Sequence, residues 1–259
     1  MTFRLLACRF ELRARRVIRF PQGLAGNVLR GALGKALRES GHTQIFEPTG
    51  TEGPSGLANR PRPFVFRCSE LNGSVVQAGK NFCFGLHIFD DSLDPLTRAL
   101  ASWADVISVQ QQPVAIPLNP LPHPVHQIRV DFQTPTELKA NSQSANGAFS
   151  ALLARARDRV STLSALYGSG PLEIDFRALA DRAASIETTR SELRHVSIHR
   201  RSRGTGQTHP IGGLVGFAEY SGSLAEFIPY LNAAHWTGVG RHCTWGNGQI
   251  TTTILNSEF

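Results

Sequence analysis

The chain has 259 residues, a formal net charge of +7 and 41% hydrophobic residues, so it is long enough and apolar enough to fold around a core. It contains no apolar run of about 18 residues and its N-terminus has only short apolar stretches, which predicts neither a membrane span nor a signal peptide and favours the cytoplasm. The four cysteines form no CxxC pair, which favours reduced thiols over a disulfide framework or a zinc site.

The positive charge is almost entirely arginine and is unevenly distributed. Of the 27 basic residues, only Lys35, Lys80 and Lys139 are lysines, and the excess positive charge lies in residues 1–41 and 155–209. Arginine presents a planar fork that binds phosphate with two donors and stacks on bases. Two separate basic stretches on a mildly acidic background therefore predict a polyanion-binding groove assembled from distant segments.

Hydrophobic periodicity in the first half predicts strands and helices in a regular order. The predicted elements are a strand at 3–12, a helix at 24–38, strands at 64–67 and 82–89, and a helix at 96–106. An exposed connection is expected at 50–63, which is rich in Gly and Pro. The proline-dense segment 113–124 is expected to break regular structure. The next strand, 127–132, either completes the first unit or opens a second one.

Two local features of this half each have two interpretations. The outer face of the helix at 24–38 carries Gly31 and Gly34 among arginines, which indicates either close approach of a ligand to the backbone or packing on another element. An acidic run ends at Asp94, and Pro95 follows it. This pair is typical of a helix start, with the acidic residues favoured by the helix dipole, and a metal site is the alternative.

The second half repeats the order of the first. A helix is predicted at 148–167, strands at 195–201 and 211–220 joined by a basic turn at 202–209, a helix at 223–234 and a final strand at 248–255. Two units of strand, helix, strand, strand, helix and strand predict an α+β chain with tandem ferredoxin-like domains, a fold that often binds RNA. We expect an N-terminal domain at 1–124 and a C-terminal domain at 125–259, the latter with an arginine-rich helical insertion and a C-terminal glycine-rich loop.

That loop is the most informative segment. Residues 238–248 read GVGRHCTWGNG, in which four glycines allow a backbone nest of N–H donors suited to an anion, and Arg241 adds positive charge. Trp245 either stacks on an unpaired base or closes a core. Cys243 stands where GxGxxG requires glycine, and no GKS or GKT is present, which excludes the dinucleotide and Walker A motifs. A purely structural glycine-rich turn is the alternative.

Together with three further segments, this loop resembles the CRISPR-associated RAMP proteins that process precursor crRNA. The segments are LRGALGKALR at 29–38, VDFQTPTELK at 130–139, and HRRSRGTGQ at 199–207 followed by GLVGFAEYSG at 213–222. Their order and spacing agree over nearly the whole chain. The resemblance implies a prokaryotic, metal-independent endoribonuclease that cuts CRISPR repeat RNA and keeps its product. The arginine content is more similar to the type IV branch than to histidine-centred members.

Such an enzyme needs no cofactor, because the 2′-OH next to the scissile phosphate is the nucleophile and the products carry a 2′,3′-cyclic phosphate and a 5′-OH. We expect Arg38 and Arg241 to stabilise the developing charge and His42, just beyond the first helix, to act as general base or acid. The expected RNA-binding residues are Arg30, Lys35, Arg155, Arg159, Arg200, Arg201, Arg203, Gly238, Gly240, His242, Trp245, Gly246, Asn247 and Gly248.

The expected partners are the crRNA hairpin and other CRISPR effector subunits, with no membrane. A non-catalytic crRNA-binding subunit of the same superfamily is the alternative function, since it would need the same basic groove. A small-molecule phosphotransferase would require a metal or nucleotide motif that the sequence lacks.

Overall fold

The computed structural model describes residues 1–48, 60–140, 143–144, 146–201 and 206–256. In the first half the elements are β1 (Thr2–Arg13), β2 (Ile18–Arg19), α1 (Ala25–Glu39), α2 (Thr43–Phe46), β3 (Phe64–Arg67), η1 (Ser69–Leu71), β4 (Val75–Val76), β5 (Asn81–Ile88), α3 (Leu93–Ala101) and β6 (Asp105–Pro117). In the second half they are β7 (Gln127–Thr136), β8 (Lys139–Ala140), β9 (Gln143–Ser144), α4 (Phe149–Tyr167), α5 (Phe176–Ala183), β10 (Glu187–Val196), β11 (His199–Arg201), β12 (Thr208–Pro210), β13 (Gly213–Ser221), α6 (Ile228–Thr237), η2 (Cys243–Trp245) and β14 (Ile250–Asn256).

Each half forms a four-stranded antiparallel sheet of ferredoxin-like topology. The first sheet has the order β3-β5-β1-β6 and the second the order β10-β13-β7-β14, so in both halves the first and third long strands are central. The second strand lies at one edge and the fourth at the other. The repeated order confirms the tandem ferredoxin-like fold predicted from the sequence.

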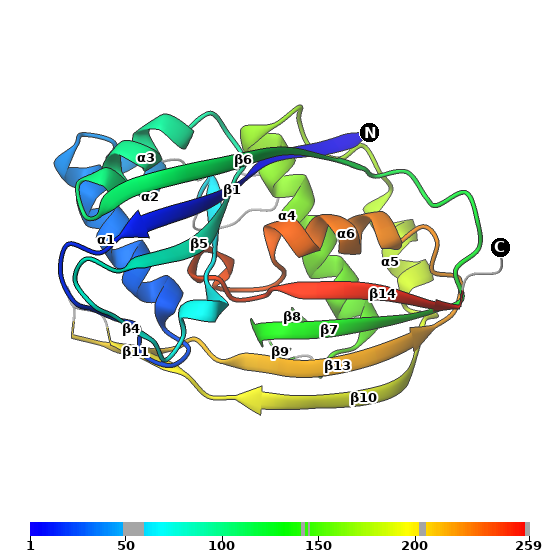
Figure 1. Cartoon of the computed structure of the whole chain (residues 1–259). Coiled ribbons are helices and arrows are strands. Elements are labelled where there is room, and N and C mark those ends of the chain that lie inside the picture. The colour runs from blue at the N-terminus through cyan, green and yellow to red at the C-terminus, as the bar shows by residue number, and fades with distance from the viewer. Residues whose placement is uncertain (49–59, 141–142, 145, 202–205, 257–259) are drawn as a thin grey trace.

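Alternation along β1 explains how the layers stack. Cys8, Phe10 and Leu12 face one side and pack into a core with α1 and α3, and the Phe10 ring stacks on Phe84 of β5 at 5.6 Å. Phe3 and Leu5 face the other side and join a second core that contains α4 and α6. In Figure 1 α4 and α6 therefore lie between the two sheets. Because this core draws on both halves, the domain division between residues 124 and 125 stays a prediction.

Two expectations about the first half are wrong. The helix expected at 96–106, with its start at Asp94 and Pro95, runs from Leu93 to Ala101 with Ser92 at the N-cap position, and Val106 belongs to β6. The segment from Pro113 was expected to break regular structure, but β6 continues to Pro117. Because β6 is an edge strand, a proline there need not remove a hydrogen bond between strands. β6 is thus the fourth strand of the first sheet, and β7 opens the second unit.

Two boundaries in the second half also differ. The expected strand at 195–201 is divided, because β10 ends at Val196 and a separate short hairpin strand, β11, begins at His199. The last helix begins at Ile228 rather than at residue 223. No helix in the described ranges is both long and apolar enough to span a membrane.

Candidate functional site

The glycine-rich loop connects α6 to β14 and is fixed by the end of β7. Gly238, Gly240, Gly246 and Gly248 all have positive φ, between 72° and 85°, a conformation that side chains disfavour. The Gly248 N–H donates to the carbonyl of Pro135, and the Thr134 hydroxyl donates to the carbonyl of Gly246. The loop is therefore a tightly bonded structure built against residues 134–137.

The expected anion nest is contradicted at most of its positions. The N–H groups of Gly238, Gly246 and Gly248 donate to carbonyls of the chain itself, and these three glycines are buried. Asn247 is buried as well, and its side-chain amide donates to the carbonyl of Ile211. These four residues shape the loop, and their burial does not support the expectation that they contact RNA.

Helix α1 lies directly against this loop. A Cβ at Gly26 would overlap the carbonyl group of Trp245, so the absence of a side chain lets the two backbones touch. Gly34, two turns further along, is covered by the ring of Phe46 from α2, whereas Gly31 faces open space. Packing on other elements, one of the two interpretations of the glycines in this helix, thus holds for Gly34 and not for Gly31.

Four guanidinium groups surround two aromatic rings where α1 meets the loop. Arg30 lies with its Cζ 4.5 Å from the Phe46 ring centre and 5.0 Å from that of Trp245, and Arg200 of β11 lies 5.1 Å from Trp245. Two further arginines lie against Phe46. We call this set the arginine cluster: Arg30, Arg38, Arg62 and Arg200 around Phe46 and Trp245. Segments from both halves of the chain meet in it, and Figure 1 shows α1, β11 and the loop on one side of the molecule.

The arginine cluster holds more positive charge than its surroundings neutralise. Burial, followed by the charges of Arg62 and Arg200, lowers the pKa of Arg30 to about 9, at which it still carries its charge at neutral pH. Six side-chain atoms among the described residues are buried without a hydrogen-bond partner, and three of them, Arg30 Nε, Arg200 Nε and Trp245 Nε1, lie in the arginine cluster. Buried donors of this kind are costly unless an acceptor reaches them. The cluster is therefore suited to bind a polyanion that brings acceptor oxygens.

The expected catalytic residues lie in different surroundings. Arg38 belongs to the arginine cluster and pairs with Glu47 at 3.0 Å. Arg241 projects from the loop and pairs with Glu137 at 3.3 Å. His42 precedes α2, and the contact of its ring is to the hydroxyl of Ser40. Among the described residues, the arginines of the cluster lie over the Phe46 and Trp245 rings and not over the His42 ring.

Ten expected RNA-binding residues remain besides the four buried loop residues. Arg30, Arg200 and Trp245 belong to the arginine cluster, and the His242 ring lies tilted against Trp245 with ring centres 4.8 Å apart. Gly240 is half-buried beside the carbonyl of Glu137. The side chains of two others are not described: Arg203 lies outside the described residues, and of Arg201 only the backbone is described.

The remaining three face elsewhere. Lys35 is exposed on α1 and pairs with Glu39, and Arg155 is exposed on α4 and pairs with Asp158. Arg159 was expected to grip RNA, but its Nε donates to the carbonyl of Thr237 at the end of α6. Arg159 thus caps a helix inside the protein. Arg157, two residues earlier on the same helix, is buried.

The last turn of α6 is also held from the first half of the chain. Arg67 of β3 donates from Nη2 to the carbonyls of His235 and Trp236, at 2.9 and 3.0 Å, and His87 of β5 bonds to the second of these through Nδ1 at 2.8 Å. Burial lowers the pKa of Arg67 to about 10 and that of His87 to about 3. A cationic Arg67 suits the negative end of the helix, and it fixes the position from which the glycine-rich loop starts.

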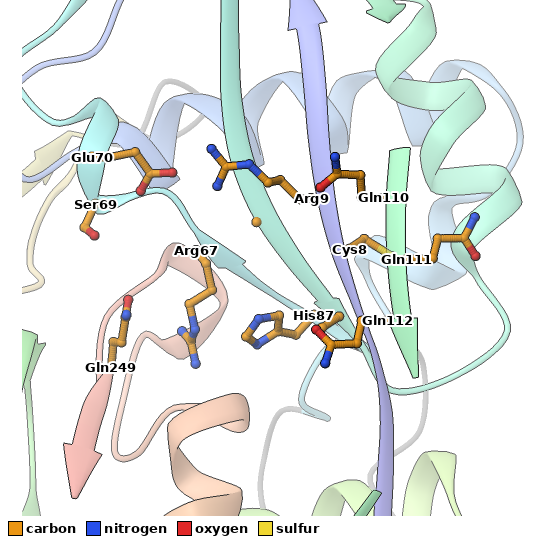
Figure 2. A pocket seen from close by; sticks show the side chains of 12 residues that line it. Cys8, Arg9, Arg67, Ser69, Glu70, His87, Gln110, Gln111, Gln112 and Gln249 are labelled. Carbon is orange, nitrogen blue, oxygen red and sulfur yellow. The ribbon is translucent and has the colours of Figure 1, made fainter. Parts of the chain in front are cut away.

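We call Arg67 and His87 at the end of α6 the clamp. A polar cleft of about 780 Å³ opens beside it. Figure 2 shows Arg67 and His87 near its middle, with Gln249 on one side, Gln112 on the other and Arg9 further along the sheet. Side-chain amides and guanidinium groups can hydrogen-bond base edges as well as phosphates. The cleft is thus a second polar surface, formed by the first sheet and the start of β14.

We did not predict a role in the site for Arg62, Phe46, Glu137 or Arg67 from the sequence. Arg62 stands in the segment RPRP at 60–63, whose alternating arginines and prolines were the available signal within an expected connection. Its Nε donates to the carbonyl of Phe46 at 2.6 Å. The acidic run near residue 90 has an ordinary structural role, because Asp90 accepts from Ser92 at the start of α3. Within the described ranges, no group of three or more His, Cys, Asp or Glu residues could hold a metal ion.

Comparison with known proteins finds families and structures that are similar to this chain. Residues 130–250 match the family model of the CRISPR-associated endoribonuclease Cas6, and residues 3–110 match a second model described as an N-terminal domain. No curated protein sequence matches the chain. Both matches together span most of the two ferredoxin-like halves.

Solved structures share the fold at low sequence identity. Cas6 of Thermus thermophilus is 16% identical, covers 98% of this chain and 99% of its own, and has a TM-score of 0.61. A Cas6 product complex is 16% identical over 97% of this chain and 100% of its own, with a TM-score of 0.60. A partial Cas6-RT-Cas1–Cas2 complex is 13% identical over 99% of this chain and 47% of its own, with a TM-score of 0.62.

This molecule combines two ferredoxin-like halves with a glycine-rich loop ahead of the last strand. Its second half matches the CRISPR-associated endoribonuclease family Cas6 over residues 130–250, and the solved Cas6 structures share the fold of both halves.

Proposed function

We propose that the chain cuts CRISPR repeat RNA without a metal ion and keeps the 3′ hairpin as a subunit of an effector complex. In this reaction the 2′-oxygen bonds to phosphorus and the P–O5′ bond breaks, leaving a 2′,3′-cyclic phosphate and a 5′-OH. The observation that carries the proposal is the arginine cluster, in which Arg30 and Arg200 from the two halves converge on Trp245. Its uncompensated charge can bind and stabilise a phosphorane that gains negative charge.

The roles follow from position. Arg38 of the arginine cluster and Arg241 of the glycine-rich loop are both ion-paired, so a phosphate would take over guanidinium groups that Glu47 and Glu137 now hold. His42 stays a candidate for proton transfer at the end of α1. The polar cleft around Arg67 receives unpaired nucleotides of the repeat, because its amides can hydrogen-bond base edges. The arginine content keeps the type IV branch as a prediction.

A non-catalytic crRNA-binding subunit is the second candidate. It is favoured by the carboxylates that pair with Arg38 and Arg241 and by the position of His42, whose ring bonds to Ser40. Such a protein would use the same arginine cluster for binding alone.

One assay separates the two candidates. Purified protein is incubated with repeat RNA in EDTA, beside an RNA with a single 2′-deoxy nucleotide before the cut site, and the product ends are identified by mass spectrometry. We expect cleavage of the first RNA only, with a cyclic phosphate end. Binding of both RNAs without product would establish the non-catalytic subunit, and cleavage that requires added Mg²⁺ would refute the metal-free mechanism. A chase with excess unlabelled RNA tests whether the 3′ product stays bound.

A further inference from the structure

His242 combines an unusual backbone with a specific side-chain environment. Among the described residues, it is the one non-glycine residue with a positive φ, at 63°. This left-handed conformation is uncommon for residues that carry a Cβ, and it persists where the surrounding structure enforces it, often at functional sites. The side chain is only 14% exposed. The loop thus directs an imidazole inward in a conformation that a glycine would adopt more readily.

The imidazole is held by a carboxylate and lies beside the arginine cluster. His242 Nε2 lies 3.3 Å from one oxygen of Glu137, whose other oxygen contacts Arg241 Nη1 at 3.3 Å. The ring lies tilted against that of Trp245, with centres 4.8 Å apart. With Nε2–H donating to Glu137, the neutral ring carries its lone pair on Nδ1.

Three other histidines have structural partners. His87 bonds to the carbonyl of Trp236, and His235 bonds to that of Ile250. His42 bonds to the hydroxyl of Ser40. His242 differs because its partner is a carboxylate and its neighbours are the tryptophan and arginines expected to bind RNA. A histidine oriented by a carboxylate is the arrangement that proton-transfer catalysis uses.

We propose that His242 is the general base of the cleavage reaction and that Glu137 is its positioning residue, an inference that rests on the proposed endoribonuclease function. Nδ1 takes the proton of the 2′-OH while the 2′-oxygen bonds to phosphorus and the P–O5′ bond breaks. The Glu137 carboxylate stabilises the imidazolium that forms. Water or another group donates a proton to the leaving O5′. The imidazolium of His242 then releases the proton that it took from the 2′-OH, so no net proton is gained or lost.

The charges around the ring fit a base that is neutral before the reaction. Burial is the main cause that lowers the pKa of His242, and the positive charges of Arg241 and Arg200 act in the same direction. Glu137 opposes them and raises the pKa. The resulting direction is downward, so the free base predominates at neutral pH. The cleavage rate should therefore rise with pH through the pKa of His242 and then level off.

The test measures single-turnover cleavage of repeat RNA against pH for wild type and His242→Asn. Asparagine tolerates the left-handed backbone and has no group that accepts a proton near neutral pH, so the variant separates proton transfer from loop folding. We expect a rate loss of about 100-fold or more, as is typical for a general base, with the pH inflection abolished. Binding of the 2′-deoxy RNA should stay within threefold of wild type. The exposed His123→Ala serves as a control that cuts like wild type.

Two further measurements assign the role. Glu137→Gln should shift the midpoint of the pH–rate profile downward, because the carboxylate that raises the imidazole pKa is gone. An RNA with sulfur in place of the bridging 5′-oxygen needs no acid for its leaving group. His242→Asn should be as impaired on this RNA as on the normal one.

Two outcomes would overturn the inference. Recovery of His242→Asn on the sulfur substrate would make His242 an acid instead of a base, and unchanged cleavage of normal RNA with the wild-type pH profile would remove it from the chemistry. In both cases wild-type cleavage still supports the proposed function. Only a wild-type protein that fails to cut at all refutes that function itself.

Discussion

Replacing Gly26 with alanine tests whether the arginine cluster depends on backbone contact between α1 and the glycine-rich loop. The added Cβ would lie 2.5 Å from the carbonyl carbon of Trp245 and closer still to its oxygen, whereas real Cβ atoms stay beyond 3.0 Å. Both partners are backbone, so neither can rotate away. Overpacking of this kind costs about 1–3 kcal/mol, and alanine returns less than about 1 kcal/mol of helix propensity in the first turn. We expect a net destabilisation of about 1–2 kcal/mol.

Gly31→Ala is the matched control in the same helix. Gly31 is exposed, and among the described residues nothing lies within 4 Å of the position that its Cβ would take. Alanine there should raise the free energy of unfolding by about 0.5–1 kcal/mol, because it reduces the freedom of the unfolded chain and favours the helix. Urea denaturation measures both variants.

Cleavage adds the functional half of this test. Because the overlap forces α1 away from Trp245, Arg30 should lose its position over the ring, and Gly26→Ala should cut repeat RNA at least tenfold more slowly at a temperature where it remains folded. Gly31→Ala should cut like wild type. Equal stabilities and equal cleavage rates for the two variants would refute the close contact between α1 and the loop.

The remaining predictions concern the charges of the site and the clamp. Arg67→Ala removes the donor of the His235 carbonyl and one of two donors to the Trp236 carbonyl, so it should lower the free energy of unfolding by about 1–3 kcal/mol, whereas Arg67→Lys should recover part of this in urea denaturation. Arg38→Ala and Arg241→Ala should each reduce the cleavage rate at least tenfold with little change in unfolding midpoint, and normal product yield in both would remove them from the site. His87, whose folded pKa is lowered to about 3, should make the protein less stable as the pH falls from about 6.5 towards 3, because the unfolded state then binds a proton that the native state does not. The slope is about 1.4 kcal/mol per pH unit, and it should be missing from the difference curve of His87→Gln.

Strand and helix periodicity predicted most of the long elements of the fold. The strands at 3–12, 64–67 and 82–89 and the helices at 24–38 and 148–167 match the structure to within about two residues. Each carries a buried face of regular spacing, which is a local property of the sequence. Proline signals were weaker guides, because the effect of Pro113 depends on whether its strand lies at a sheet edge.

The candidate site was predictable in outline only. Arginine content and the glycine-rich loop led to Arg30, Arg200 and Trp245, which the structure brings together. The direction of individual side chains did not follow from the sequence. Arg159, for example, was expected to bind RNA, but it donates to the end of α6. Phe46 and Arg62 carry no motif, and their contribution depends on the short helix that returns the chain to α1.

By itself, the sequence determined the order of elements, the family resemblance and the location of positive charge, because each of these is written in residue types and spacing. Only the tertiary structure decided which charges act on a ligand and which stabilise the protein. The reason is that an arginine at a helix end and an arginine over an aromatic ring are alike in sequence. They differ in whether backbone carbonyls lie within hydrogen-bonding reach of the guanidinium group, and that depends on how the two sheets and their helices pack.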